Sequence, residues 1–238
     1  MALGSFEYVL LFTLTLILIG GKSLLGAFLL NRVIENTKKR GNFEIDFVFG
    51  IFILVLCFAV SRILYTYFDF FLTRFDYNKY HLIPNQYVWK AASVVFLSGL
   101  AILMFIIDKK VINFKFKGVF AYIIIAVIIF ELIYPISSAD DFELIAMVET
   151  IGALIGVILF PMIFIYLGIK TPRLRKISLI FAFGIIIFAI GAGIQARFVI
   201  IPLMEIYGAI MKSIVWIISI SMKLIGLTMI TYSCTKFY

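Results

Sequence analysis

Long apolar runs alternate with short polar segments along nearly the whole chain. A bilayer core about 30 Å thick is crossed by roughly 20 apolar residues in a helix. By that criterion the pattern predicts seven membrane-spanning helices, separated by charged or polar connections. Their approximate ranges are 7–31, 47–68, 88–107, 118–136, 143–168, 176–201 and 207–233. The apolar residues extend all the way round each helix, so the pattern does not fix which face meets a neighbouring helix.

The composition supports this interpretation. Hydrophobic residues make up 64% of the 238 residues and charged residues only 14%, with a mean hydropathy of +1.15. A soluble domain usually holds about 25% charged residues. We therefore predict an all-α membrane protein, a single seven-transmembrane-helix bundle over residues 1–238, located as a multi-pass protein in the plasma membrane. The first segment, MALGSFEYVLLF, lacks a basic region and is interpreted as part of the first span.

The basic residues predict the orientation of the bundle. The first, third and fifth loops and the C-terminal tail hold 13 Lys and Arg residues, against 3 in the other loops. The positive-inside rule then places the N-terminus outside and the C-terminus in the cytoplasm. Nucleic acid is not an expected partner, because orientation accounts for the net charge of +8. The expected partners are a cytoplasmic signalling protein or anionic lipid. The basic residues that would meet them are Arg32, Lys38, Lys39, Arg40, Lys109, Lys110, Arg173, Arg175 and Lys176.

The second loop, residues 69–89, is rich in Phe and Tyr and ends at Trp89. Aromatic side chains gather at membrane–water interfaces. We therefore expect an aromatic belt at the outer surface, with a short interfacial helix. A lid that contacts a ligand is the alternative.

Six polar residues lie inside the spans near their predicted outer ends, where charged groups are costly and often functional. One interpretation is that they pair with one another between helices or extend to the interface. The other is that they form an outward-facing pocket for a small polar ligand or ion. These candidate ligand-binding residues are Arg62, Glu131, Glu149, Gln195, Arg197 and Lys212.

Two intramembrane lysines, Lys22 and Lys223, lie deeper in the first and last predicted spans. The inner halves of the spans contain no acidic residue, so we expect neither lysine to have an intramembrane partner. Together they suggest a path for an anion through the membrane.

With a lysine, Lys223, in the last of seven predicted spans, the chain resembles the microbial rhodopsins. This resemblance implies that Lys223 would carry retinal as a Schiff base. The segment SMKLIGLTMI places Ser221 two residues before the lysine and a glycine three residues after it. Other positions depart from the family: Ser219 stands where the pumps usually carry an aspartate, and the third span lacks a carboxylate counter-ion. We therefore expect no retinal and no other cofactor.

A second resemblance covers residues 160–191, FPMIFIYLGIKTPRLRKISLIFAFGIIIFAIG. Its features are Pro161, the YLGIK exit, the RLRK loop, Gly184 and Gly191. The block resembles uncharacterised seven-span proteins of archaea, Asgard archaea among them, and is similar to seven-helix sensor modules of histidine kinases. This resemblance implies a receptor-like bundle without catalytic residues. Because the chain carries no kinase domain, its output would need a separate partner.

These observations leave several functions open. The leading hypothesis is a receptor or sensor that binds a small ligand or ion from the outer side and signals through basic cytoplasmic loops. The alternatives are a transporter or channel with an anion path past the two lysines, the retinal photoreceptor, and a structural subunit. An enzyme is not expected, since the single histidine, His81, lies in a loop and Cys57 and Cys234 are far apart in the chain. No metal site is expected for the same reason.

Overall fold

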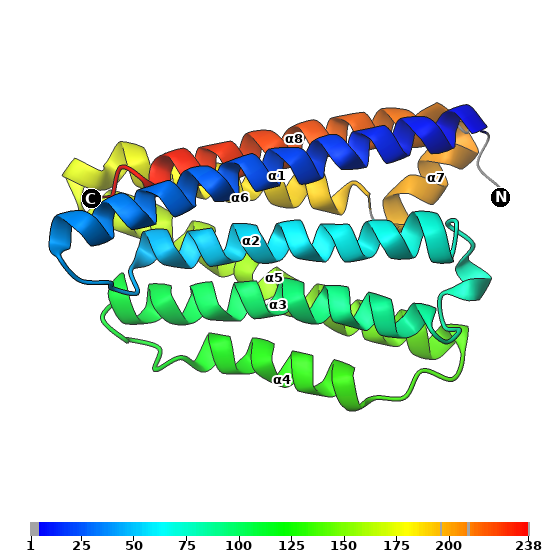
Figure 1. Ribbon diagram of the computed structural model, residues 1–238, viewed down its shortest axis with the longest axis horizontal. Coiled ribbons are helices and arrows are strands. Elements are labelled where there is room, and N and C mark those ends of the chain that lie inside the picture. Colours follow the sequence, from blue (N-terminus) through cyan, green and yellow to red (C-terminus); the bar gives the residue numbers. More distant parts are fainter. Residues whose placement is uncertain (1–4, 196, 209, 238) are drawn as a thin grey trace. The chain divides into compact units, whose positions relative to one another are not determined.

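The computed structural model describes residues 5–195, 197–208 and 210–237, and these residues form helices and turns without any strand (Figure 1). A π-helical turn, η1 (Tyr67–Leu72), and the short 3-10 helices η2 (Tyr77–Lys79) and η3 (Pro172–Leu174) join longer elements. The α-helices are α1 (Ser5–Arg40), α2 (Phe47–Thr66), α3 (Asn85–Lys110), α4 (Val119–Ile133), α5 (Ala139–Lys170), α6 (Arg175–Gly193), α7 (Arg197–Tyr207) and α8 (Ile210–Cys234).

Among the described residues, six helical segments are long and apolar enough to cross a membrane. The prediction of an all-α, multi-pass membrane protein is thereby confirmed at that level. The remaining predicted span corresponds to α4, which has only 15 residues. At 1.5 Å per residue it is about 22 Å long, shorter than the hydrocarbon core. The count of seven spans and the orientation therefore stay predictions.

The sixth predicted span, 176–201, is wrong at its C-terminal end. Helix α6 ends at Gly193, and α7 starts as a separate helix of 11 residues that contains Pro202. The sequence GAG at residues 191–193 weakens the helix at this point, because glycine has a low helix propensity. The long apolar runs before and after these residues concealed this interruption.

The chain forms two compact units. The first contains residues Ser23–Gly156, and the second combines Leu3–Lys22 with Val157–Tyr238. Helices α1 and α5 each contribute one part to each unit. The polar residues near the predicted outer ends are therefore divided between two separately packed cores.

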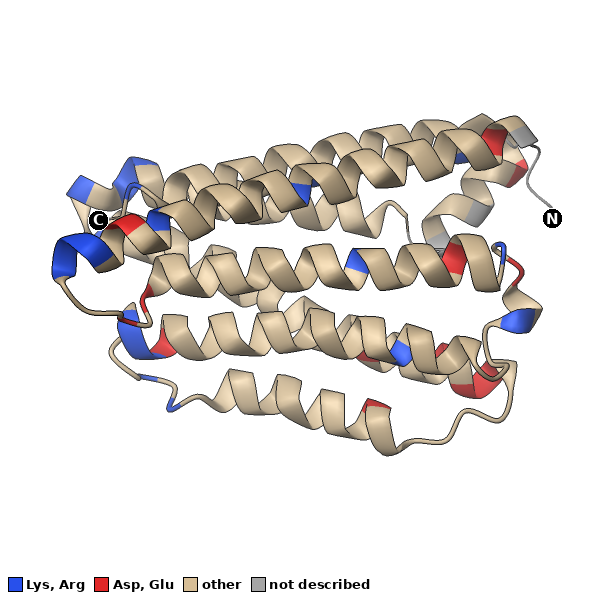
Figure 2. Ribbon diagram, in the orientation of Figure 1, with Lys and Arg blue, Asp and Glu red and all other residues tan. Residues whose placement is uncertain are grey.

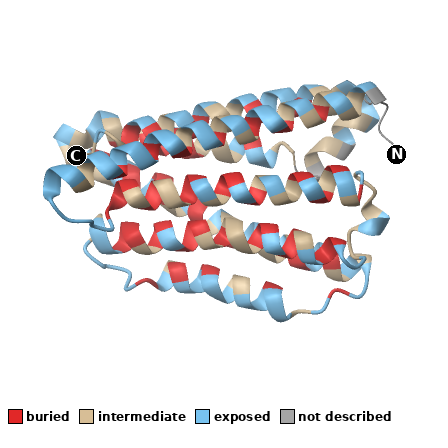
Figure 3. Ribbon diagram, in the orientation of Figure 1, coloured by how far each residue is buried: buried red, intermediate tan, exposed pale blue. Residues whose placement is uncertain are grey.

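In the first unit, α2, α3 and α4 run antiparallel to their neighbours (Figure 1). Asp46 caps the start of α2 by accepting a hydrogen bond from the backbone N–H of Phe49 at 2.9 Å. Leu97 and Leu103 of α3 are fully buried. Helix α4 is mostly exposed (Figure 3) and buries only Ala121, Ile124 and Glu131. A carboxylate therefore lies on the single buried stripe of this helix.

The connection between α3 and α4 is organised by Asp108, which is 4% exposed. Its carboxylate accepts hydrogen bonds from the backbone N–H groups of Phe116 and Gly118. Gly118 has φ +77° at the start of α4, a conformation that favours glycine. The connection is thus fixed next to the basic end of α3 (Figure 2).

In the second unit, α6 and α8 approach each other through glycine. A Cβ atom at Gly226 would lie 2.5 Å from the Gly184 carbonyl oxygen and 2.6 Å from the Phe188 backbone nitrogen. These atoms belong to the backbone, so they cannot move away as a flexible side chain would. Ser219 of α8 adds a hydrogen bond from its hydroxyl to the Gly191 carbonyl oxygen. Close backbone contact therefore holds this helix pair together.

Candidate functional site

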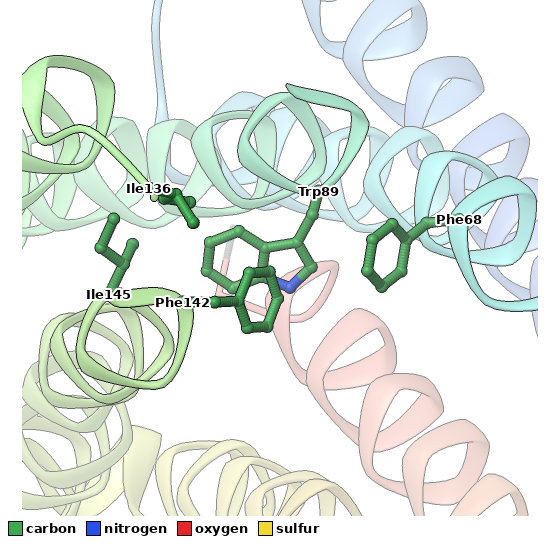
Figure 4. Packing of buried hydrophobic residues seen from close by; sticks show 5 residues of the cluster. All are labelled: Phe68, Trp89, Ile136, Phe142 and Ile145. Atoms are coloured by element: carbon green, nitrogen blue, oxygen red, sulfur yellow. The ribbon is translucent and has the colours of Figure 1, made fainter. Parts of the chain in front are cut away.

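The predicted aromatic belt in the second loop is wrong for Trp89, which is only 6% exposed. Trp89 belongs to a buried cluster with Ile136, Phe142, Ile145 and Phe68, the residue just before the loop, which is 1% exposed. Figure 4 shows the Trp89 ring between Phe68 and the two isoleucines, with Phe142 beside it at a centroid distance of 4.7 Å. These side chains are drawn inward because they fill the end of the first unit, where four chain segments meet. We call this group the aromatic cluster.

Glu131 is the most buried acidic residue of the first unit, at 1% exposure. Its Oε2 atom accepts a hydrogen bond from the Ser93 hydroxyl of α3 at 2.8 Å. Its Oε1 atom has no hydrogen-bond partner within the described part of the chain. A buried carboxylate oxygen without a donor is costly, so this atom marks a position where a ligand group would be stabilised.

Glu149 of α5 lies in electrostatic reach of Glu131. Its Oε1 atom accepts a hydrogen bond from the hydroxyl of Tyr65 of α2 at 2.8 Å. Ser93 also interacts with Glu149 and with Tyr65. The four side chains Tyr65, Ser93, Glu131 and Glu149 therefore form one connected group, which we call the polar cluster. It draws one residue from each of the helices α2, α3, α4 and α5.

Two cations border the polar cluster. Lys90 of α3 is 7% exposed, interacts electrostatically with Glu131 and donates a hydrogen bond to the Tyr134 carbonyl oxygen at 2.7 Å. Arg62 lies one turn before Tyr65 and pairs with Asp69 at 4.0 Å. Because Asp69 offsets Arg62, the polar cluster holds two carboxylates against the single ammonium of Lys90. Carboxyl oxygens accept hydrogen bonds from the N–H groups of a cationic ligand, so this balance favours a cation over an anion.

The aromatic cluster covers the polar cluster toward one end of the unit. On each of three helical segments, an aromatic residue lies one or two turns nearer to that end than the segment's residue of the polar cluster. Phe68 follows Tyr65, Trp89 precedes Ser93, and Phe142 precedes Glu149. Tyr65 of the polar cluster packs against the aromatic cluster, and so does Tyr134, whose carbonyl oxygen accepts the hydrogen bond from Lys90. A ligand approaching from this end would have to displace aromatic side chains.

The structure brings together only part of the predicted ligand-binding set. Glu131 and Glu149 meet in the polar cluster, and Arg62 lies beside it. Gln195 and Lys212 belong to the second unit, where both are half-buried on separate segments. Arg197 begins α7, but its side chain lies outside the described residues.

The expectation that Lys223 lacks a partner is wrong. Its ammonium donates a hydrogen bond to the Gln195 side-chain oxygen, just after α6 ends. Lys22, the other intramembrane lysine, is 6% exposed on α1.

Sequence reasoning missed Tyr65, Ser93 and Asp69, and it counted Lys90 as one of the three basic residues in the loops on the predicted outer side. A signal for two of them was present. Tyr65 follows Arg62 by three residues, and Ser93 follows Lys90 by three residues. Residues three apart share a helix face. Tyr65 and Ser93 therefore each form, with a charged residue, a polar face on an otherwise apolar span.

Comparison with protein-family models, with characterised proteins and with solved structures found no match. In the described part of the chain, no group of three or more His, Cys, Asp or Glu residues is placed to hold a metal ion. The functional argument therefore rests on the geometry of the polar cluster.

Proposed function

We propose that this chain is a membrane receptor or sensor in which a small cation binds from the outer side at the polar cluster. The helix shift caused by ligand binding would then pass to the basic cytoplasmic loops. The observation that carries the proposal is Glu131: a carboxylate at 1% exposure whose Oε1 atom accepts no hydrogen bond from the described residues. Polar groups buried this deeply in a membrane helix are costly and usually serve function.

The position of the polar cluster suits signalling. A ligand bound there would touch side chains from α2, α3, α4 and α5, and would favour whichever arrangement of these helices pairs its charge best. The C-terminal ends of α1 and α3, on the side that the charge pattern assigns to the cytoplasm, carry Lys38, Lys39, Arg40, Lys109 and Lys110. Small helix shifts at the polar cluster would therefore alter the basic face on which a partner docks.

The aromatic cluster would close the end of the unit that the charge pattern assigns to the outside. Trp89 and Phe142 lie between the polar cluster and that end. They would keep water from the carboxylates until a ligand arrives, which strengthens the electrostatic attraction for a cation.

Thermal unfolding of the purified protein tests the proposal. The probes are sodium chloride, potassium chloride and the chloride salts of methylamine and ethylamine, at constant ionic strength. We expect at least one of the four cations to raise the unfolding temperature of the wild type above its value in the other salts. Glu131→Gln should abolish that shift. Glu205→Gln, an exposed carboxylate on α7, is the control and should keep the shift. A wild type that responds equally to all four salts would refute a cation site.

A transporter is the second candidate, favoured by the interruption between α6 and α7. Discontinuous helices line substrate sites in many transporters, and here Gln195 bonds to the half-buried Lys223 next to the interruption. Chloride flux into liposomes tests this function. A transporter predicts flux that Lys223→Met removes, whereas a receptor predicts none in either protein.

A further inference from the structure

A cavity of about 750 Å³ lies in the first unit between α3, α4 and residues 43–49. On α3 it is lined by Ala101, Ile102 and Phe105, and on α4 by Tyr122, Ile125 and Ile128. These positions recur every three or four residues, so each helix presents one continuous face to the cavity. The lining along both helices is almost entirely apolar. We call this cavity the α3–α4 groove.

The charges of the α3–α4 groove are confined to one end. Lys109 and Lys110, in the last turn of α3, line that end together with Glu44. Glu44 accepts a hydrogen bond from Lys110 at 2.6 Å and fixes that ammonium in place. Lys109 is exposed beside it. Two ammonium groups against one carboxylate leave this end positive.

The neighbouring connection adds to the positive charge. It carries Lys115 and Lys117, both exposed. The buried carboxylate next to this connection, Asp108, accepts hydrogen bonds from the backbone N–H groups of Phe116 and Gly118. A positive rim therefore borders the groove at the basic end of the unit.

The groove also has the length of one bilayer leaflet. Its lining on α3 runs from Ser98 to Lys110, about 18 Å at 1.5 Å per residue. Half of the hydrocarbon core is about 15 Å. An acyl chain that begins at the lysines would thus follow the groove toward the bilayer centre.

We propose that the α3–α4 groove binds one anionic glycerophospholipid of the leaflet at the basic end. Its phosphate lies against Lys109 and Lys110, and one acyl chain lies between α3 and α4. This inference goes beyond the proposed function, because it concerns a different surface and does not require a ligand at the polar cluster. Charge decides the occupant: a positive rim on an apolar groove matches an anionic headgroup on an apolar chain.

Native mass spectrometry of the purified protein, with phosphatidylglycerol titrated against phosphatidylcholine of the same chains, tests the charge requirement. We expect one phosphatidylglycerol to bind more tightly than phosphatidylcholine. Lys109→Gln should weaken phosphatidylglycerol binding about fivefold, the effect of one basic residue near an anionic headgroup. Lys39→Gln, an exposed lysine at the end of α1 that does not line the groove, should leave binding unchanged.

A second pair of variants tests the acyl-chain path. Ile102 and Ile123 are both 42% exposed, and only Ile102 lines the groove. Ile102→Trp should fill the groove and remove tight binding of phosphatidylglycerol, whereas Ile123→Trp should not. Equal unfolding temperatures of the two variants would show that loss of lipid is not loss of folding.

Three results would overturn the proposal. Equal affinity for the two lipids would remove the role of charge. Equal effects of Ile102→Trp and Ile123→Trp would remove the groove. Loss of a dimer on Ile102→Trp, measured as protein mass, would make the groove an interface between two copies of the chain.

Discussion

The two units bury polar groups by different means. In the first unit, side chains meet side chains: Tyr65 bonds to Glu149, Ser93 bonds to Glu131, and large rings fill the space beside them. In the second unit, the backbones of α6 and α8 meet at Gly184 and Gly226. The Ser219 hydroxyl bonds to a backbone carbonyl oxygen of α6, and the Lys223 ammonium bonds to the Gln195 side chain. The first arrangement leaves a buried carboxylate oxygen, Glu131 Oε1, for a ligand, whereas the second leaves little room between α6 and α8. This difference is why the proposed receptor site lies in the first unit.

The largest expected effect comes from emptying the aromatic cluster. Trp89→Ala should lower the free energy of unfolding by about 3–5 kcal/mol, the usual cost of removing a large buried aromatic side chain. The measurement is an equilibrium unfolding titration in detergent micelles. Tyr87→Ala, two residues earlier and 59% exposed, is the control and should change stability by less than about 1 kcal/mol. Equal losses for both variants would mean that the aromatic cluster does not hold the first unit together.

A single added methyl group should break the close packing of the second unit. Gly226→Ala places a Cβ within 2.6 Å of backbone atoms of α6, and we expect a loss of about 2 kcal/mol, as for other overpacked cores. Gly20→Ala is the matched control, because a Cβ there meets nothing within 4 Å. That control should be neutral or stabilise by up to about 1 kcal/mol. An unchanged Gly226→Ala protein would disprove the backbone contact between α6 and α8.

A smaller loss should follow from removing one hydroxyl of the polar cluster. Tyr65→Phe keeps the ring but leaves the Glu149 Oε1 atom without its donor. We expect a loss of about 1–2 kcal/mol, since hydrogen bonds to carboxylates are stronger than those between neutral groups. Tyr67→Phe, on the same helical segment and 49% exposed, should change stability by less than about 0.5 kcal/mol. If the two variants behave alike, Tyr65 does not stabilise the first unit through Glu149.

The smallest effect concerns the ion pair at the end of the α3–α4 groove. The pKa of Glu44 lies below its ordinary value of 4.5, because its carboxylate accepts a hydrogen bond from Lys110 and feels the charges of Lys110 and Arg40. A lowered pKa in the folded state means that the stabilisation is complete above pH 4.5 and is lost as the pH falls through the lowered pKa. Because Glu44 is exposed, the change should be slight.

Unfolding temperatures between pH 6 and pH 3 measure this effect. Glu44→Gln and Lys110→Gln should each flatten the same small part of the curve, and the double variant should add nothing further. Additive effects of the two substitutions would show that the ion pair does not form in solution.

The polar cluster illustrates how much the sequence could predict. Glu131 and Glu149 stood out because a carboxylate in an apolar run is rare and costly. Their partners did not stand out, because serine and tyrosine are common in membrane helices and carry no charge. The pairing of Tyr65 with Glu149 joins residues 84 positions apart, and an apolar pattern that surrounds each helix gives no rotation from which to infer it.

The sequence by itself determined that this is a helical membrane protein, because about 20 successive apolar residues have no other stable solution than a helix in a bilayer. It also determined which positions carry charge within that apolar background. Tertiary structure decided that Trp89 turns inward and that Lys223 meets Gln195. Each of these depends on the space and the hydrogen-bond partners that a neighbouring helix supplies, and that neighbour is brought close only when the chain has folded.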